Sequence, residues 1–370
     1  MKAARTALLL LLFLLLPFHN NKLAAKEQHT TAKYQKETAQ SSELKASKGS
    51  DYVNKGKELL ILWWNVENLF DTKNDKQVDD REFTPGGSRH WTPKKLLLKQ
   101  LRIAQVFRAI EQEREYGRHP DIVAFAETEN RGVFEGTLQA IDHARYKVDY
   151  HESPDPRGID IGLAWNPATL KFTGSKPYRV TLDNGRGTRY VIVAGFMASG
   201  HPFSVVLNHW PSRSFDAKWS EPKRIAAAKV ARHIVDSLTT RNPMAEIIVM
   251  GDFNDHPNDR SIRTVLGSSF DRKEVTRSAN RLLYNCWNDI KSPGTYYYRK
   301  QWERIDQILV SPALLDNSKL SIDTQSFRVF SIPEMFSHPG KTLYSTYQRG
   351  KFKGGYSDHL PLLLKIDVVP

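Results

Sequence analysis

The sequence predicts an α/β protein: a four-layer sandwich in which two mixed β-sheets pack face to face with helices on the outside. Short runs rich in Val, Ile and Leu are typical of strands buried on both faces. They are Leu59–Trp63, Ile122–Phe125, Val205–Leu207 and Ile247–Met250. Hairpin-like turns such as Asp183-Asn184-Gly185 join further strands, expected at Gly158–Trp165, Arg189–Phe196 and Pro202–Leu207. A purely parallel doubly wound sheet would lack such hairpins.

Two long helices are expected among these strands. Thr92 suits an N-cap and Pro93 the first helical position, and apolar residues at helical spacing extend this helix to about Glu115. The second helix is expected to begin after Ser220, with Pro222 in its first turn. Helices placed between hairpins fit the outer layers of a sandwich.

Three segments divide the chain. Residues 1–25 combine Lys2 and Arg5 with an apolar run from Ala7 to Leu16, which is typical of a signal peptide. The run is shorter than the ~20 residues that a membrane-spanning helix needs, although a permanent anchor is the alternative. Residues 26–58 contain almost no large apolar side chain and predict a flexible polar linker. Residues 59–370 predict one folded domain.

The cysteine content and the net charge indicate the cellular compartment and the class of binding partner. Cys286 is the only cysteine, so no disulfide can form within the chain, and a signal peptide then favours a secreted or periplasmic bacterial protein. The formal net charge of +13 favours a polyanionic partner, although a merely soluble basic surface has the same charge. We expect a monomer without stable membrane insertion after signal cleavage.

Polar motifs follow the apolar runs, where predicted strands end. They are Trp64-Asn65-Val66-Glu67, Ala126-Glu127-Thr128, Asn208-His209-Trp210, Gly251-Asp252-Phe253-Asn254, Arg304-Ile305-Asp306 and Ser357-Asp358-His359. A strand that ends in Asp, Asn, Glu or His lifts that side chain from a rigid core into a cleft. One such motif alone can be a simple Asx-turn. The series together predicts one converging active site.

In this order the motifs closely resemble the endonuclease/exonuclease/phosphatase superfamily, which includes pancreatic-type deoxyribonuclease I, apurinic endonucleases, bacterial sphingomyelinases and inositol-polyphosphate 5-phosphatases. The resemblance covers about Leu60 to Lys365. It implies a deoxyribonuclease I-like sandwich and a metal-dependent hydrolase of phosphoester bonds. Such hydrolysis needs a cation on the phosphate oxygens, a positioned water and donors facing the charge that develops.

The resemblance also implies catalytic roles. Asp252 would orient and deprotonate the attacking water, and Asn254 would donate to the phosphoryl oxygens. Asp252 and Asn254 alternate along an expected extended segment, so both are predicted to face the cleft. His359 would lie against the phosphate with Asp306 accepting its other ring hydrogen, and His209 would donate to a non-bridging oxygen.

Hard oxygen ligands without thiolates favour Mg²⁺ or Mn²⁺ over Zn²⁺. Glu127 is the first choice of metal ligand, and Asn65 would hold a metal-bound water. Glu67 would complete the set, unless it is an exposed loop carboxylate. Asp358 is either a further ligand or a partner behind the ligands. Separately, an acidic loop between residues 71 and 82 either binds Ca²⁺ or is simply solvated, and its spacing matches no EF-hand.

Substrate class depends on weaker features. The segment 208–213 is similar to one in secreted bacterial nucleases of the superfamily, which implies that Arg213 meets a neighbouring phosphate. Two loops mix aromatic and basic residues, which suits stacked bases and a phosphate backbone. Their candidate contacts are Tyr298, Arg299 and Lys300 in the first loop, and Arg349 and Lys351 in the second. Hairpin tyrosines half packed on the core are the alternative for the first loop.

The sequence therefore predicts a secreted, metal-dependent phosphodiesterase, with an endonuclease acting on DNA or RNA as the first hypothesis. An inositol-phosphate phosphatase or a sphingomyelinase-like phosphoesterase is the alternative enzyme. A non-catalytic module that binds a polyanion is the alternative from another class. It is disfavoured because every expected catalytic position is filled.

Overall fold

The computed structural model describes residues 58–368, except 143, 184, 214–215, 317–318 and 338–341. The predicted signal peptide and all but the last residue of the predicted linker lie outside the described residues. Glu58 already belongs to the first strand. Within the described part of the chain, no helix combines the length and the apolar character needed to cross a membrane.

The first sheet has seven strands and contains both termini of the folded unit. Its strands, in spatial order, are β14 (Leu320–Ile322), β18 (Leu362–Val368), β1 (Glu58–Leu69), β2 (Ile122–Thr128), β4 (Asp160–Trp165) and β3 (Lys147–Tyr150), with β15 (Arg328–Val329) also paired to β18. β1 and β2 run parallel, and the other pairs are antiparallel.

The second sheet also has seven strands. In spatial order they are β5 (Lys171–Tyr178), β6 (Val191–Ala198), β7 (His201–His209), β8 (Ile247–Asp252), β13 (Asp306–Val310), β10 (Leu283–Asn285) and β9 (Ser268–Ser269). β7 and β8 run parallel, while β5, β6 and β7 form the expected antiparallel hairpins. Both sheets are therefore mixed, as predicted.

Helices and two small hairpins complete the fold. The α-helices are α2 (Pro93–Gln112), α3 (Arg131–Ile141), α4 (Ala217–Arg241) and α5 (Arg272–Arg277), and η2 (Ser261–Gly267) is a π-helix. Short 3₁₀ turns are η1 (Arg81–Phe83), η3 (Cys286–Asp289), η4 (Pro312–Leu315), η5 (Thr324–Ser326) and η6 (Pro333–Met335). The hairpins are β11 (Tyr296–Tyr298) with β12 (Gln301–Glu303), and β16 (Tyr347–Gln348) with β17 (Lys351–Phe352).

The second long helix starts one turn earlier than predicted. Asp216, rather than Ser220, is the N-cap, and its carboxylate accepts from the Lys218 N–H at 2.6 Å. Pro222 consequently lies inside the helix, where it removes one backbone donor. The first helix ends at Gln112 rather than Glu115, and Asn184 of the predicted turn is outside the described residues.

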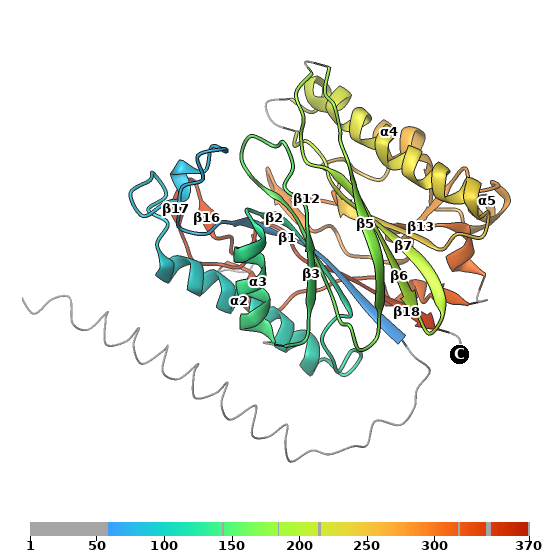
Figure 1. Ribbon diagram of the computed structural model, residues 1–370, viewed down its shortest axis with the longest axis horizontal. Helices are drawn as coiled ribbons and strands as arrows, with labels where there is room; N and C mark the ends of the chain where they lie inside the picture. The colour runs from blue at the N-terminus through green and yellow to red at the C-terminus, as the bar shows by residue number, and fades with distance from the viewer. Residues whose placement is uncertain are drawn as a thin grey trace, which may run out of the picture. The chain divides into compact units, whose positions relative to one another are not determined.

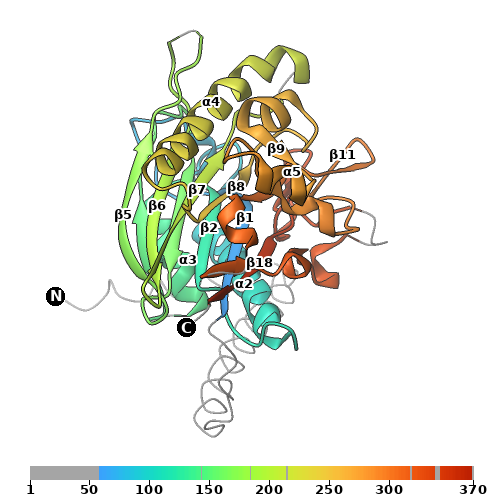
Figure 2. The same cartoon turned by 90° about the vertical axis from the view of Figure 1, so that its right-hand side faces the viewer.

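Side-chain alternation along β1 builds the layers. Leu59, Ile61 and Trp63 pack between the two sheets, whereas Leu60 and Leu62 pack under α2 and α3. α4 covers the outer face of the second sheet. Figure 1 shows the order α2 and α3, first sheet, second sheet, α4, and Figure 2 looks onto the second sheet from the side that α4 covers. The predicted four-layer sandwich is confirmed.

Gly251 permits the close approach of β7 and β8 just before the site. A Cβ atom at this position would lie 2.2 Å from the backbone oxygen of Asn208. We predict that Gly251→Ala lowers the free energy of unfolding by about 1–3 kcal/mol, since one strand must move. Gly86→Ala is the control, because no atom lies within 4 Å of its Cβ. Urea unfolding measures both, and equal midpoints for the two variants would contradict the packing argument.

Candidate active site

The ends of four strands bring the predicted polar residues together. The parallel pairs β1–β2 and β7–β8 each end on the same side, and Asn65 of β1 joins them. Its amide nitrogen lies 3.2 Å from Glu127 Oε1 on β2 and 3.1 Å from Asp252 Oδ2 on β8. The two carboxylates belong to different sheets, so this amide connects the halves of the site.

A backbone hydrogen bond orients the Asn65 amide. Its Oδ1 accepts the backbone N–H of Glu67 at 3.0 Å, and its nitrogen faces the two carboxylates. Asn65 therefore donates to both carboxylates, and its role in holding a metal-bound water stays a prediction. The backbone here is strained, because Glu67, Asn68 and Glu127 have φ angles of 55°, 51° and 64°. Asn68 donates its N–H to Glu127 Oε2 at 2.9 Å, which fixes that carboxylate.

His359 and Asp306 form a buried pair. His359 Nδ1 lies 2.7 Å from Asp306 Oδ2, and Asp306 also accepts from Trp63 Nε1 at 2.9 Å and Thr295 Oγ1 at 2.5 Å. Burial by itself lowers the pKa of His359, but Asp306, with Asp358 and Asp252, raises this pKa well above its ordinary value. His359 is thus held as an imidazolium, with Nε2 3.9 Å from Asp252 Oδ2.

His209 has the opposite electrostatic environment. Its Nε2 lies 3.8 Å from Asp252 Oδ2, but burial and then Arg189 keep its pKa well below the ordinary value, so the ring is neutral. Arg189 donates to the backbone oxygens of His209 at 2.9 Å and Trp210 at 2.6 Å, and pairs with Asp155 at 2.7 Å. Sequence reasoning missed this buried pair, which fixes the segment that carries His209.

Asp252 is a buried carboxylate at the end of β8. It is 2% exposed, and its Oδ1 accepts the Asn254 N–H at 2.9 Å. Burial, followed by repulsion from Asp306, raises the pKa of Asp252 to about 7. The expected extended segment is wrong, because Asn254 has a φ of 52° and its amide donates to the Trp210 oxygen at 3.1 Å. A left-handed turn therefore replaces the predicted alternation.

Glu67 is a buried carboxylate rather than an exposed loop residue. It is 4% exposed and accepts the backbone N–H groups of Thr346 at 2.6 Å and Tyr347 at 3.0 Å. Burial, and then Asp358, raises the pKa of Glu67 to about 7. The Asp358 side chain is 41% exposed, and desolvation, opposed by His359 and reinforced by Glu127, raises its pKa to about 6.

Sequence reasoning also missed Lys99, whose side chain is buried in α2 beside these carboxylates. A signal existed, since Lys99 lies on the apolar stripe of the predicted helix, three residues after Leu96 and four before Ile103. A lysine on such a stripe is either paired with negative charge or functional.

The donor set fits a divalent cation. Asp252, Asp306 and His359 each place one ligand atom within 4.8 Å of the others and could bind a metal. Glu127, Glu67 and Asp358 supply further hard oxygens. Desolvation first, and then repulsion between carboxylates, raises the pKa values of Glu67 and Asp358, and a bound cation would relieve that repulsion. Both groups of side chains therefore offer ligands for a divalent cation.

The hairpin β11–β12 lies against the site. The Tyr296 ring lies 4.7 Å from the His359 ring, and the Tyr298 ring lies 6.1 Å beyond it with 46% exposure. Arg299 lies over Tyr298 at 5.2 Å. Arg299 and Lys300 occupy the turn with φ angles of 46° and 68°, a conformation in which glycine or asparagine is usual.

Arg213 does not lie free for a phosphate. It forms an ion pair with Glu303 of β12, and so braces this hairpin. Tyr297 packs on Trp302 against the core, so the prediction of core packing is correct for one face of the hairpin. The other face carries Tyr296 and the exposed Tyr298. In the second hairpin, Arg349 and Lys351 are exposed at the turn between β16 and β17.

The acidic loop is partly buried. Asp80 is 1% exposed and accepts the Asp75 N–H at 2.8 Å, so simple solvation does not describe it. Burial raises the pKa of Glu129 beside it to about 9. The three-ligand group described above does not include these residues.

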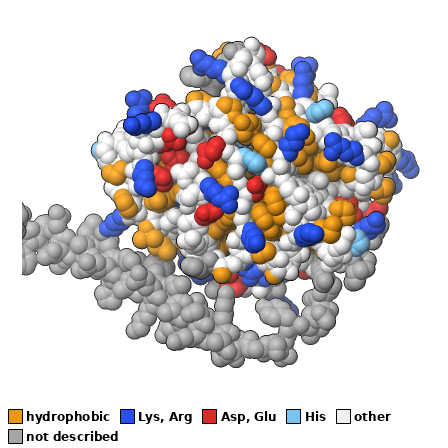
Figure 3. Space-filling view, in the orientation of Figure 1, with side chains coloured by type: hydrophobic (Ala, Val, Ile, Leu, Met, Phe, Trp, Pro, Cys, Tyr) orange, Lys and Arg blue, Asp and Glu red, His pale blue; other side chains and the backbone are white. Residues whose placement is uncertain are grey.

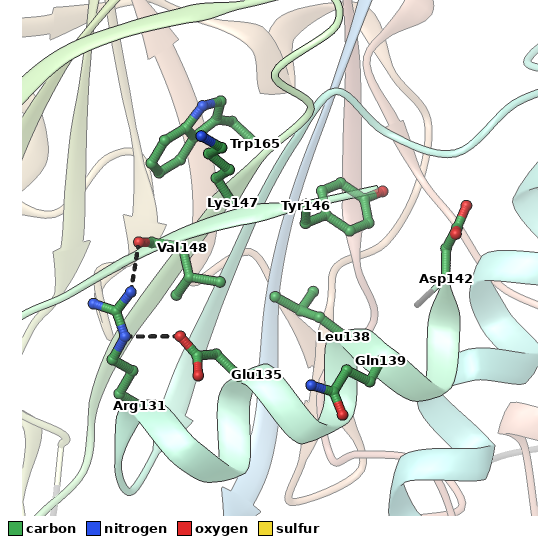
Figure 4. Close-up of a pocket in the computed structure, with 9 residues that line it drawn as sticks. All are labelled: Arg131, Glu135, Leu138, Gln139, Asp142, Tyr146, Lys147, Val148 and Trp165. Carbon is green, nitrogen blue, oxygen red and sulfur yellow. Dashed lines mark hydrogen bonds and ion pairs between the residues drawn. The ribbon is translucent and has the colours of Figure 1, made fainter. Parts of the chain in front are cut away.

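A separate hollow of about 350 Å³ lies between α3 and β3. Figure 4 shows Arg131 in contact with Glu135 and with the backbone oxygen of Val148 at one end. The hollow is lined by Arg131, Glu135, Leu138, Gln139, Asp142, Tyr146, Lys147, Val148 and Trp165, none of which belongs to the candidate site.

The sequence model of the endonuclease/exonuclease/phosphatase family matches residues 60–368. The chain belongs to this family. Its members are hydrolases of phosphoester bonds, and the resemblance carried by the six motifs is confirmed. The match includes every strand-end motif of the site.

Solved structures agree on the fold. The human Nocturnin catalytic domain with bound sulfate is 16% identical, with a TM-score of 0.51, over 86% of this chain and 97% of that one. The Bacteroides thetaiotaomicron mannosyl-6-phosphatase is 15% identical, with a TM-score of 0.52, over 84% and 100%. D. rerio TDP2 complexed with single-strand DNA product is 16% identical, with a TM-score of 0.50, over 84% and 100%. A search of curated proteins gives no match.

The buried carboxylates predict how stability depends on pH without metal. The pKa values of Asp252 and Glu67 rise to about 7 from ordinary values of 3.8 and 4.5, so the folded state retains protons that the unfolded chain has released. Their stabilisation is complete below pH 4 and is lost as pH rises through about 7. His209 acts in the opposite direction, because its pKa is lowered.

We therefore expect the urea midpoint in EDTA to be lower at pH 8 than at pH 5, and Mg²⁺ at pH 8 to restore it. Asp252→Asn should show a shallower decrease, because one titrating group is gone. A midpoint that rises between pH 5 and pH 8 in EDTA would refute this account.

Proposed function

We propose that the protein is a divalent-metal-dependent phosphodiesterase, and that its substrate is a nucleic acid. The observation that carries this proposal is Asp252, a buried carboxylate whose Oδ2 lies 3.8 Å from His209 Nε2 and 3.9 Å from His359 Nε2. Family membership supports phosphoester hydrolysis. We further propose that residues 1–25 export the protein to the bacterial periplasm or exterior.

The geometry supports in-line attack by water. Asp252, with a pKa of about 7, accepts the proton of the water as the new P–O bond forms. The imidazolium of His359 and the neutral ring of His209 donate to the phosphoryl oxygens as negative charge develops. The bond to the leaving oxygen then breaks, and that oxygen takes a proton from solvent.

Glu127, with Glu67 and Asp358, would hold Mg²⁺ or Mn²⁺. When bound, the ion supplies charge that draws electron density from the phosphate oxygens. Asn65 keeps Glu127 and Asp252 apart by donating to both, so the two like charges are compatible in one site.

The rim supports a nucleic acid. Tyr296 and Tyr298 form an open stack that begins on His359, and base–aromatic stacking contributes roughly 1–3 kcal/mol per base. Arg299 and Lys300 then lie where the backbone of a stacked strand would run. TDP2, complexed with single-strand DNA product, shares the fold.

A phosphatase of inositol phosphates or a sphingomyelinase-like enzyme is the second candidate. Arg213 is already neutralised by Glu303, which removes one predicted phosphate contact. On the face shown in Figure 3, Lys and Arg side chains are scattered among acidic ones instead of forming one continuous patch. The mannosyl-6-phosphatase, which shares the fold, acts on a small phosphoester.

We predict that Glu127→Gln, Asp252→Asn, His209→Ala and His359→Ala each lower turnover roughly 10²–10⁴-fold. Glu135→Gln, in the exposed ion pair on α3, is the control and should retain full activity. The assay uses plasmid DNA, RNA, inositol phosphates and sphingomyelin, each with Mg²⁺, Mn²⁺ or EDTA. Undiminished cleavage in EDTA would end the metal proposal, and preference for inositol phosphates or sphingomyelin would select the second candidate.

Salt dependence tests the nucleic-acid rim. Each contacted phosphate of a single strand should add about 0.7 to the slope of log affinity against log salt. Replacing Arg349 and Lys351 by Gln should reduce this slope by roughly 1 to 2, whereas Lys171→Gln with Lys176→Gln, exposed on β5, should leave it unchanged. Fluorescence anisotropy of labelled DNA, with the Asp252→Asn protein to prevent cleavage, measures it. Equal slopes for the two double variants would remove these residues from the interface.

A further inference from the structure

Lys99 places a buried positive charge beneath the proposed metal ligands. Its side chain is 1% exposed, and its ammonium donates to Thr346 Oγ1 at 2.5 Å and to the Tyr356 backbone oxygen at 3.3 Å. Thr346 in turn donates its N–H to Glu67 Oε2 at 2.6 Å, so one residue separates the ammonium from that carboxylate. Both oxygens that accept from Lys99 are neutral. Its charge is therefore not consumed by a single ion pair.

A buried ammonium requires negative charge nearby, since burial alone strongly disfavours the charged form. Burial lowers the pKa of Lys99, while Glu67, Asp358 and Glu127 attract the charge and hold this pKa at about 8. These three carboxylates are the ones that the proposed function assigns to the metal. Asp252 and Asp306 lie instead beside the imidazolium of His359.

Charge balance then limits the number of ions. Glu67, Asp358 and Glu127 together carry three negative charges when ionised, and Lys99 supplies one positive charge. One divalent ion neutralises the remainder. Asp252 and Asp306 carry two further negative charges and His359 carries one positive charge, so a second divalent ion beside them would leave one excess positive charge in a poorly solvated site. The ammonium thus contributes what a second cation would otherwise contribute.

We propose that Lys99 takes the place of a second metal ion, so that the site binds a single divalent cation held chiefly by Glu127. The inference rests on the proposed metal-dependent function and assigns its stoichiometry. Lys99 is a positioning residue, because it acts on the ligands through space and through the segment 346–356. It is not expected to touch the substrate.

The adjacent lysine on the same helix face provides a matched control. Lys95 lies one turn earlier on α2, and its ammonium is 4.6 Å from the Phe352 ring of the same hairpin. It also donates to the Arg89 backbone oxygen at 3.0 Å. Burial is the only cause that lowers the pKa of Lys95, without attraction from the site carboxylates. Removing this charge should therefore disturb the hairpin without changing the charge of the site.

The experiment counts Mn²⁺ ions on the full chain at pH 7, where the Lys99 ammonium keeps its charge, by electron paramagnetic resonance and titration calorimetry. Ions that are lost in Glu127→Gln are assigned to the site. We expect one ion in the wild type and in Lys95→Met. In Lys99→Met we expect a second ion, with the first bound about tenfold more tightly or better, because removing a buried positive charge strengthens attraction for a divalent ion.

Two site ions in the wild type would overturn the inference, and so would a single ion of unchanged affinity in Lys99→Met. If Lys99→Met does not fold, Lys99→Gln is measured in its place, and the wild-type count is decisive by itself. A wild type that binds no Mn²⁺ would contradict the proposed metal-dependent function. One site ion in an inactive wild type would contradict the function while leaving the stoichiometry intact.

Discussion

The site depends on the hydrogen bonds by which β1 reaches from its own sheet to the other. Trp63 and Asn65 lie on the same face of β1, because alternate residues of a strand share a face. Trp63 donates to Asp306 on β13, and Asn65 donates to Asp252 on β8. Trp64, on the opposite face, donates to the backbone oxygen of His359 at 2.9 Å. Three successive residues of one buried strand thus fix the positions of Asp306, Asp252 and His359, and these positions depend on the packing of that strand.

Carboxylates from two sheets lie close together in the site and repel one another. His359 offsets this repulsion beside Asp306 and Asp252, and Lys99 offsets it beside Glu67. His359 touches Asp306 and becomes an imidazolium, whereas His209 is buried beside Arg189 and stays neutral. The same residue type therefore supplies a cation and an uncharged donor. Lys99 compensates the Glu67 side without occupying a coordination position. The pKa of Asp252 stays near neutrality because His359 offsets burial and Asp306 only in part.

The sequence predicted the sheets and the converging motifs because both follow local rules: apolar runs for buried strands, and polar residues where strands end. Features set by distant partners could not be predicted in this way. Lys99 meets Thr346, which is 247 positions away, and Arg213 meets Glu303, 90 positions away. Asn254 was expected to be extended, yet it turns to the left-handed region because its amide binds Trp210. The predicted start of α4 was one turn late because Asp216, and not Ser220, caps the helix.

Glu67 connects the buried carboxylates of the site to the β16–β17 hairpin at its edge. Both of its oxygens accept N–H groups of Thr346 and Tyr347, at the start of the hairpin whose turn carries Arg349. A cation that coordinates Glu67 would share its two oxygens with those N–H groups, so ion binding and hairpin position involve the same carboxylate. Thr346 is also held by Lys99 from below. The residues proposed to hold the ion therefore also contact the segment that leads into the basic turn, and we expect binding at the rim to depend on the charge state of these carboxylates.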